Sequence, residues 1–199
     1  MKKFFTIKTI AGLGVLTAIL VCLYFLSTVV RIGTLTLNLT LIPIAVGACL
    51  FGPFGGLFLG LVDGALNLTA PETGAFLTMN AWATVLLVLI KTGAAGFIAG
   101  LIFQPFKNKH PFVGCVLASI SVPLLNTGIF LAGFLLFFSE MVAAAATEAG
   151  KSIFEYTVIL FIGLNFLIEF LVNAILSTVV HTVYAAFEKR LDDWELQSF

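Results

Sequence analysis

The chain contains 199 residues, of which 60% are hydrophobic and 10% are charged, and 21 of them are phenylalanine. About a quarter of the residues in soluble domains are charged, so this composition excludes an ordinary soluble fold and predicts a protein that lies in the lipid bilayer. The formal net charge is zero, which excludes the broad basic surface that would indicate a nucleic-acid partner.

The apolar segments predict an all-α integral membrane protein, a compact bundle of six transmembrane helices in a single domain that covers residues 1–199. Each crossing needs about 20 residues, and the connections between the apolar runs are short. The second helix reaches a full span only if it is extended back through Leu35. In chain order, we expect helices over residues 6–30, 41–51, 53–68, 83–103, 112–138 and 154–187.

Proline and glycine mark the connections. The segment 52–56, Gly-Pro-Phe-Gly-Gly, predicts a tight turn between the second and third helices, because proline favours the first position of a helix. Residues 69–74 are predicted as a loop, residues 76–82 as a segment that re-enters the apolar zone, and residues 139–152 as a short surface helix. Pro123 is expected to kink the fifth helix, since it removes a backbone hydrogen bond.

The distribution of basic residues predicts the orientation. Six crossings put both termini on one side of the membrane, and basic residues are concentrated in cytoplasmic segments. The opposite loops hold only Arg31 and Lys151. We therefore expect a multi-pass protein of the cell membrane with cytoplasmic N- and C-termini, and the basic residues on that side are Lys2, Lys3, Lys8, Lys107, Lys109, Lys189 and Arg190.

The last helix carries polar residues at four-residue spacing. Asn165, Glu169 and Asn173 therefore lie on one face near the middle of the span. Polar and ionisable side chains are costly in hydrocarbon and face the interior of a bundle, where they bind a ligand or hold helices together by hydrogen bonds. Both interpretations stay open for this stripe.

Lys91 lies roughly 13 Å along the fourth helix from Trp82, at 1.5 Å per residue. At this depth we expect its ammonium to pair with Glu169 or Asp63, or to bind an anionic group of a ligand. Asp63 and His181 are expected to form hydrogen bonds with neighbouring helix backbones or with each other.

Further polar side chains cluster at the outer end of the bundle. Asn80, Trp82 and Thr84 could hydrogen-bond to a small molecule or stack on it, although Trp82 could equally anchor the helix at the interface and Asn80 could cap it. Asn126 follows Pro123 and could either complete a pocket or satisfy the carbonyl that the proline frees. The predicted substrate-binding residues are thus Asn80, Trp82, Thr84, Lys91, Asn126, Asn165, Glu169 and Asn173.

The first helix carries the small residues Ala11, Gly14 and Ala18. The spacing of Gly14 and Ala18 leaves a flat strip on which another helix can pack, either inside this bundle or on a partner protein. No nucleotide-binding loop, protease or lipase motif is present, and the cysteines lack the spacing of metal ligands. We therefore predict neither an enzyme nor a cofactor or metal site.

The whole chain resembles the substrate-binding S components of energy-coupling factor (ECF) vitamin importers. The resemblance rests on the chain length, the six predicted helices, the small-residue strip and three segments. These are Leu-Ile-Pro-Ile-Ala at 41–45 leading into Leu-Phe-Gly-Pro-Phe-Gly-Gly at 50–56, Phe-Leu-Thr-Met-Asn-Ala-Trp at 76–82, and Pro-Leu-Leu-Asn-Thr-Gly at 123–128.

The resemblance implies a subunit that binds a vitamin from outside and docks through its first helix on a transmembrane scaffold protein, driven by two cytoplasmic ATPases. It also implies a pocket at the outer parts of helices four to six, covered by the loops after helices one and three. In this family the docking strip commonly reads Ala-xxx-Ala, whereas Val15 interrupts that pattern here. The mixed amide, lysine and glutamate interior suits a carboxylate with hydroxyl or amide groups, which favours pantothenate over folate, riboflavin or other vitamins.

Two alternatives from other classes stay open. A stand-alone secondary transporter or channel would use Asp63, Lys91, Glu169 and His181 as an ion path and would transport without partners. A non-transport assembly subunit would use the same side chains to hold helices together and would bind no small molecule.

Overall fold

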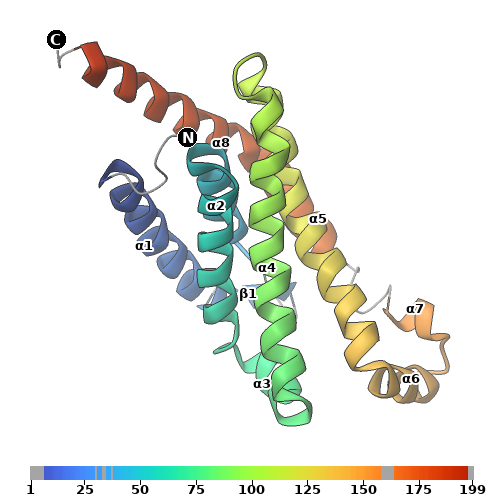
Figure 1. Cartoon of the computed structure of the whole chain (residues 1–199). Helices are drawn as coiled ribbons and strands as arrows, with labels where there is room; N and C mark the ends of the chain where they lie inside the picture. Colours follow the sequence, from blue (N-terminus) through green and yellow to red (C-terminus); the bar gives the residue numbers. More distant parts are fainter. Residues whose placement is uncertain (1–6, 30, 33–34, 37, 158–163, 197–199) are drawn as a thin grey trace.

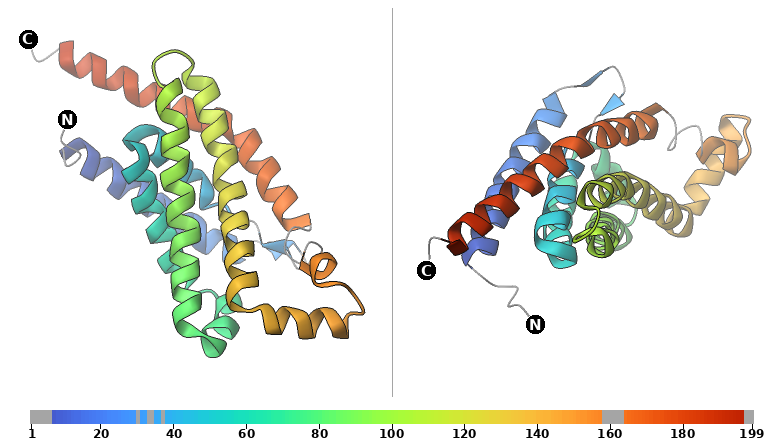
Figure 2. Two further views of the ribbon diagram at one scale, coloured as in Figure 1. Left: turned by 45° about the vertical axis from the view of Figure 1, so that its right-hand side comes forward. Right: turned by 90° about the horizontal axis from the view of Figure 1, so that it is seen from above.

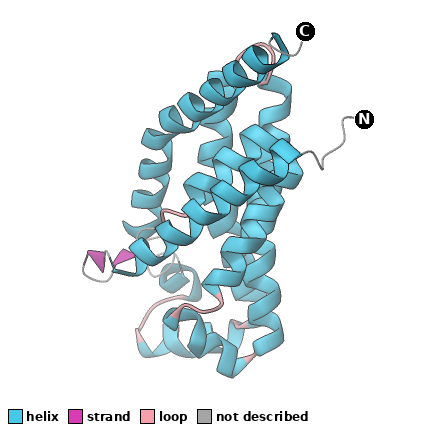
Figure 3. Ribbon diagram, turned by 90° about the vertical axis from the view of Figure 1, so that its left-hand side faces the viewer, coloured by secondary structure: helices cyan, strands magenta, loops and turns pink. Residues whose placement is uncertain are grey.

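The computed structural model describes residues 7–29, 31–32, 35–36, 38–157 and 164–196, and it is almost entirely helical in these ranges (Figure 1). Strands β1 (Arg31–Ile32) and β2 (Leu35–Thr36) pair antiparallel and form a small hairpin beside the helices (Figure 3). A 3-10 turn (η1) covers Gln104–Phe106. The helices are α1 (Ile7–Val29), α2 (Leu41–Asn67), α3 (Pro71–Met79), α4 (Ala81–Phe103), α5 (Pro111–Phe137), α6 (Ser139–Glu148), α7 (Ile153–Thr157) and α8 (Leu164–Leu196).

Five helical segments of the described chain are long and apolar enough to cross a membrane, and they lie within α1, α2, α4 with η1, α5 and α8. Large apolar side chains such as Ile7, Leu136 and Ile175 are mostly exposed on the outside of the bundle. A surface of this kind is favourable against hydrocarbon and unfavourable against water. The predicted all-helical membrane fold is confirmed in this form, with five candidate spanning helices among the described residues.

α2 reverses direction at Gly52. This residue has φ 73° and ψ −165°, a conformation that favours glycine because a Cβ would clash there. The Thr40 hydroxyl, just before α2, donates to the carboxylate of Asp63, 23 residues later, whereas a straight helix would hold these positions about 35 Å apart. The two arms, 41–51 and 53–67, therefore form a hairpin whose turn lies at the predicted glycine-proline segment.

The first arm of this hairpin is short. Eleven residues span about 16 Å, roughly half of the 30 Å of bilayer hydrocarbon. In the structure the two arms together form α2, one of the five candidate spanning segments, whereas the sequence predicts two separate helices.

The second arm of α2 packs directly on α4, backbone against backbone. A Cβ added to Gly56 would lie 2.1 Å from the Gly96 carbonyl oxygen, and a Cβ on Gly96 would lie equally close to the Gly56 oxygen. One turn further on, a Cβ on Gly60 would lie 2.2 Å from the Thr92 oxygen. Glycines that face each other at this spacing let two helices approach as small-residue motifs do in membranes. α2 and α4 therefore form the central pair of the bundle (Figure 1).

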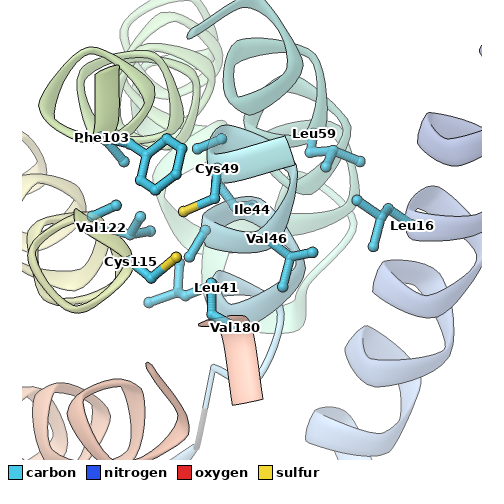
Figure 4. Packing of buried hydrophobic residues seen from close by; sticks show 14 of the residues in the cluster. Leu16, Leu41, Ile44, Val46, Cys49, Leu59, Phe103, Cys115, Val122 and Val180 are labelled. Atoms are coloured by element: carbon cyan, nitrogen blue, oxygen red, sulfur yellow. The ribbon is translucent and has the colours of Figure 1, made fainter. Parts of the chain in front are cut away.

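A buried apolar cluster fills the part of the bundle nearer the C-terminal end of α8. Cys49 on α2 and Cys115 on α5 point toward each other, with Phe103, Val122 and Val180 around them (Figure 4). The Phe103 ring also meets Tyr184 edge to face, with centroids 5.0 Å apart. This cluster closes one end of the bundle with well-packed side chains.

Three predicted segments differ from the structure. α3 begins at Pro71, inside the predicted loop 69–74, and continues to Met79 in the predicted re-entrant segment 76–82. Proline fits the first helical position, and Glu72 is favourable in the first turn. The surface helix α6 ends at Glu148. The predicted helix 154–187 is represented by α7 and α8, and its residues 158–163 lie outside the described residues. α6 and α7 extend away from the bundle (Figure 2).

Candidate binding cavity

A cavity of about 320 Å³ lies among α1, the second arm of α2, and α3, α4, α5 and α8. Phenylalanines form much of its wall, and hydroxyl, amide and charged groups from other helices complete it. A small concave site of this size, apolar with a few polar groups, is typical of small-molecule binding. Its polar lining residues are Tyr24, Ser27, Thr28, Asn38, Asn67, Glu72, Thr73, Thr84, Lys91, Asn126, Thr127 and Glu169.

Lys91 extends from α4 into this cavity. Its Nζ lies 4.9 Å from the centroid of the Phe130 ring of α5, a distance at which the ring face attracts a cation. Asp63 and Glu169 both interact with the ammonium electrostatically, and neither forms a direct ion pair with it among the described residues. The lysine is thus held by an aromatic face and by two carboxylates at longer range, and its ammonium still faces the cavity.

Glu169 lines the cavity from α8 with 9% of its side chain exposed. Its carboxylate lies near the backbone N–H of Asn38, in the connection before α2. Asn173, one turn further along α8, is buried and does not line the cavity. Its Nδ2 donates to the Glu169 carbonyl at 2.9 Å, while its Oδ1 finds no hydrogen-bond partner in the part of the chain that the structure describes. The side chain of Asn165 lies outside the described residues.

Asn126 and Thr84 reach the cavity from α5 and α4. Asn126 is 6% exposed, and its Oδ1 has no hydrogen-bond partner among the described residues. Thr84 is buried, and its hydroxyl donates to the Asn80 carbonyl at 2.8 Å. A buried amide without a partner costs free energy, so Asn126 is the polar group of this wall that most needs a partner from inside the cavity.

Asn80 and Trp82 lie away from the cavity lining. The Asn80 side chain caps α4 by accepting from the Ala83 N–H at 3.1 Å, and Trp82 is 87% exposed. The geometry agrees with the capping and interfacial roles that the sequence also allowed for these two residues. Four of the eight predicted substrate-binding residues therefore line one cavity, namely Thr84, Lys91, Asn126 and Glu169.

The sequence analysis missed the contributions of α1 and of the connection before α2. Tyr24, Ser27 and Thr28 line the cavity near the end of α1, and the Tyr24 hydroxyl lies 3.1 Å from the Thr69 hydroxyl. The clustering of these three polar side chains at the end of an otherwise apolar helix is a pattern from which a polar site could have been predicted. Asn38 gave no such signal, because its place depends on how the chain enters α2.

Asp63 and His181 do not contact each other, although such a contact was one of the two roles predicted for them. Asp63 is completely buried and bonds to Thr40 and Asn67. His181 packs edge to face on Phe112 at 5.2 Å and is not part of the cavity lining. The ion path of the alternative hypothesis therefore has no continuous set of groups from Glu169 to His181 in the described chain.

The spanning helices and this cavity define a multi-pass membrane protein with an internal polar site. Residues 8–184 match the family described as "ECF transporter, substrate-specific component", and the chain belongs to this family. It is therefore a transport subunit and not an enzyme, as the sequence resemblance predicts. No curated protein and no solved structure shows significant similarity to the chain.

Proposed function

We propose that this chain captures a small water-soluble vitamin or a related nutrient in the cavity, with pantothenate as the leading candidate. The observation that carries the proposal is the convergence of Lys91, Asn126 and Glu169, from three different helices, on one cavity whose wall includes five phenylalanines. Holding helices together does not require these groups to face an open space.

The chemistry of these three groups supports a specific kind of substrate. Lys91 offers a cation to a carboxylate, and a charge-assisted hydrogen bond is about twice as strong as a neutral one. Glu169 accepts from a hydroxyl or N–H group, and Asn126 can serve either role. The Phe130 and Phe76 side chains cover the apolar part. An acid with hydroxyl and amide groups, such as pantothenate, satisfies all of them.

The charge distribution supports an outward-facing cavity. The connection between α4 and α5, which carries Lys107 and Lys109, lies at the end of the bundle where α8, which carries Lys189, also ends (Figure 1). At the other end lie α3, whose Glu72 lines the cavity, and α6, which carries Glu140. By the positive-inside rule the first end is cytoplasmic. The α2 hairpin begins and ends at the same end of the bundle, so the chain crosses the membrane an even number of times, which supports cytoplasmic termini and a cavity that faces the outside.

The exposed face of α1 supports a docking role. Ala11, Gly14 and Ala18 are all exposed, and a Cβ on Gly14 would meet nothing within 4 Å. The opposite face of α1, with Leu13 and Leu20, packs on the bundle. The small-residue strip is thus not covered by any other described segment, which supports docking on a transmembrane scaffold subunit that two cytoplasmic ATPases would drive.

Native mass spectrometry of the purified solitary chain tests the binding role. We expect a stoichiometric small molecule that leaves on mild activation, with the mass of pantothenate or of another vitamin. The matched variants are Lys91→Met and Lys107→Met, which remove a cavity lysine and an exposed one. The first is expected to weaken binding of an anionic cargo by about 10- to 150-fold, which corresponds to a lost charged hydrogen bond of about 1.5–3 kcal/mol. The second is expected to leave binding unchanged.

Two results would contradict the proposal. One is an empty spectrum from folded protein that persists after a panel of vitamins is added, which favours the assembly-subunit alternative. The other is uptake by vesicles that contain this chain alone, driven by an ion gradient, which favours a secondary transporter.

A further inference from the structure

The buried carboxylate of Asp63 connects two segments that border the cavity. On one side it accepts from the Thr40 hydroxyl, which also contacts the Asn38 side-chain amide. On the other side it accepts from Asn67 Nδ2 at 3.0 Å. Asn38 and Asn67 both line the cavity, whereas Asp63 and Thr40 are fully buried behind it. One carboxylate is thus linked to two cavity-lining amides, directly to Asn67 and through Thr40 to Asn38, while it does not itself line the cavity.

We propose that Asp63 is a positioning residue, which fixes the Asn38 and Asn67 amides so that both present their carbonyl oxygens to the cavity. For Asn67 the geometry is direct, because its Nδ2 donates to the Asp63 carboxylate and also to the Asp63 backbone carbonyl at 2.9 Å. Both N–H bonds of this amide are used, and only its oxygen is left for the cavity.

The orientation of the Asn38 amide depends on where the single hydroxyl proton of Thr40 points. The Thr40 hydroxyl carries a single hydrogen, yet two atoms assigned as oxygens lie within hydrogen-bond distance, one on Asn38 and one on Asp63. Because an amide's nitrogen and oxygen are assigned from the hydrogen-bond network, the arrangement that satisfies an ionised Asp63 has Asn38 Nδ2 donating to Thr40 and Thr40 donating to Asp63. The Asn38 oxygen then faces the cavity. The opposite order, with a protonated Asp63, would turn the Asn38 N–H bonds toward the cavity.

The same connections hold the surrounding backbone. The Asn67 carbonyl accepts from the Thr73 hydroxyl at 2.7 Å, which ties α3 to the end of α2. The Asn38 backbone N–H lies near the Glu169 carboxylate. Asp63 is therefore connected through Asn67 to α3 and, through Thr40 and Asn38, to the surroundings of the Glu169 carboxylate.

The arrangement has a consequence for the substrate that rests on the proposed function. Two carbonyl oxygens beside the Glu169 carboxylate make this part of the cavity an acceptor surface, opposite in character to the Lys91 ammonium. The part of the substrate that meets it carries hydroxyl or N–H donors. A cargo without any such donor would overturn this consequence and leave the positioning role of Asp63 intact.

The side-chain NH₂ signals of the asparagines test the positioning role directly and need no substrate. The full chain, labelled with ¹⁵N in the side chains of its seven asparagines, is studied in lipid nanodiscs, and each signal is assigned by a single Asn→Asp substitution. The NH₂ groups of Asn38 and Asn67 are expected to exchange with water at least tenfold more slowly than that of the exposed Asn108. The Asn80 signal, at the start of α4, serves as the internal control.

Two variants separate positioning from general destabilisation. Thr40→Val keeps the shape of the side chain and removes its hydroxyl, so exchange should accelerate at Asn38 and stay unchanged at Asn67 and Asn80. Asp63→Asn should accelerate exchange at both Asn38 and Asn67. Fast Asn38 exchange in the unmodified chain, or an Asn38 signal that Thr40→Val leaves unchanged, would overturn the proposal. Should Asp63→Asn fail to fold, these two measurements still decide the matter.

Discussion

The contact between Gly56 and Gly96 predicts a large effect for a small change. Gly56→Ala adds one methyl group 2.1 Å from the Gly96 carbonyl oxygen, whereas ordinary contacts of a Cβ begin at about 3.4 Å. The two helices must separate by about 1.3 Å, the difference between these distances, and neither backbone can rotate away. Overpacking of this kind costs about 1–3 kcal/mol, and we expect the upper part of that range because the obstacle is backbone.

The control for this substitution is Gly14→Ala on α1, where a Cβ meets nothing within 4 Å. Both variants gain the roughly 1 kcal/mol by which alanine favours a helix over glycine, so the difference between them isolates the contact. We expect Gly56→Ala to unfold about 2–3 kcal/mol more easily than Gly14→Ala in the same detergent, measured by tryptophan fluorescence during denaturation. Equal stability of the two variants would refute the close packing of α2 and α4.

Three further predictions concern other parts of the molecule. Trp82→Ala should change the affinity for the cargo identified by mass spectrometry less than twofold in a fluorescence-independent binding assay, because Trp82 is 87% exposed. Gly14→Leu should leave binding by the solitary chain unchanged and reduce uptake in vesicles that also hold the scaffold and the ATPases by more than tenfold, because a large side chain disrupts close helix packing. Finally, hydrogen bonds from the Ser152 N–H and hydroxyl lower the pKa of Glu155 below its ordinary 4.5. Their stabilisation of α7 is therefore complete above pH 4.5 and is lost as the pH falls through the lower folded value. Amide exchange in α7, corrected for the intrinsic effect of pH, should accelerate over that range, and Glu155→Ala should abolish the pH dependence.

The long helices could be predicted from the sequence because each corresponds to a long run of apolar residues. α1, α4 and α5 begin and end within two residues of their predicted bounds, since an uninterrupted apolar run is bounded by charged or proline-containing connections. α3 was missed because nine residues with little apolar periodicity resemble a loop. The reversal at Gly52 was visible from the glycine and proline, whereas the length of the first arm depended on packing.

Part of the cavity lining could be predicted from the sequence, because polar side chains that are costly in hydrocarbon must lie inside the bundle. Lys91, Asn126 and Glu169 are expensive in hydrocarbon, so their place inside the bundle was predictable without knowing the fold. Trp82 and Asn80 can lie at a membrane surface at little cost in free energy. The sequence does not determine the rotation of α4 that turns these two side chains away from the cavity. Asn38 enters the site through the connection before α2, whose path is set by contacts such as that of Thr40 with Asp63.

The two ends of the bundle differ in a way that bears on transport. The cluster around Cys49, Phe103 and Cys115 is almost fully buried, so the described side chains fill the bundle between the cavity and that end. Parting well-packed helices costs several kcal/mol, since each opened apolar contact forfeits burial and leaves a void. The chain has no nucleotide-binding motif that could supply this energy. Under the proposed orientation, release of the cargo into the cytoplasm therefore requires work from partner subunits, and a strip such as that around Gly14, unused within the bundle, is where those partners could deliver it.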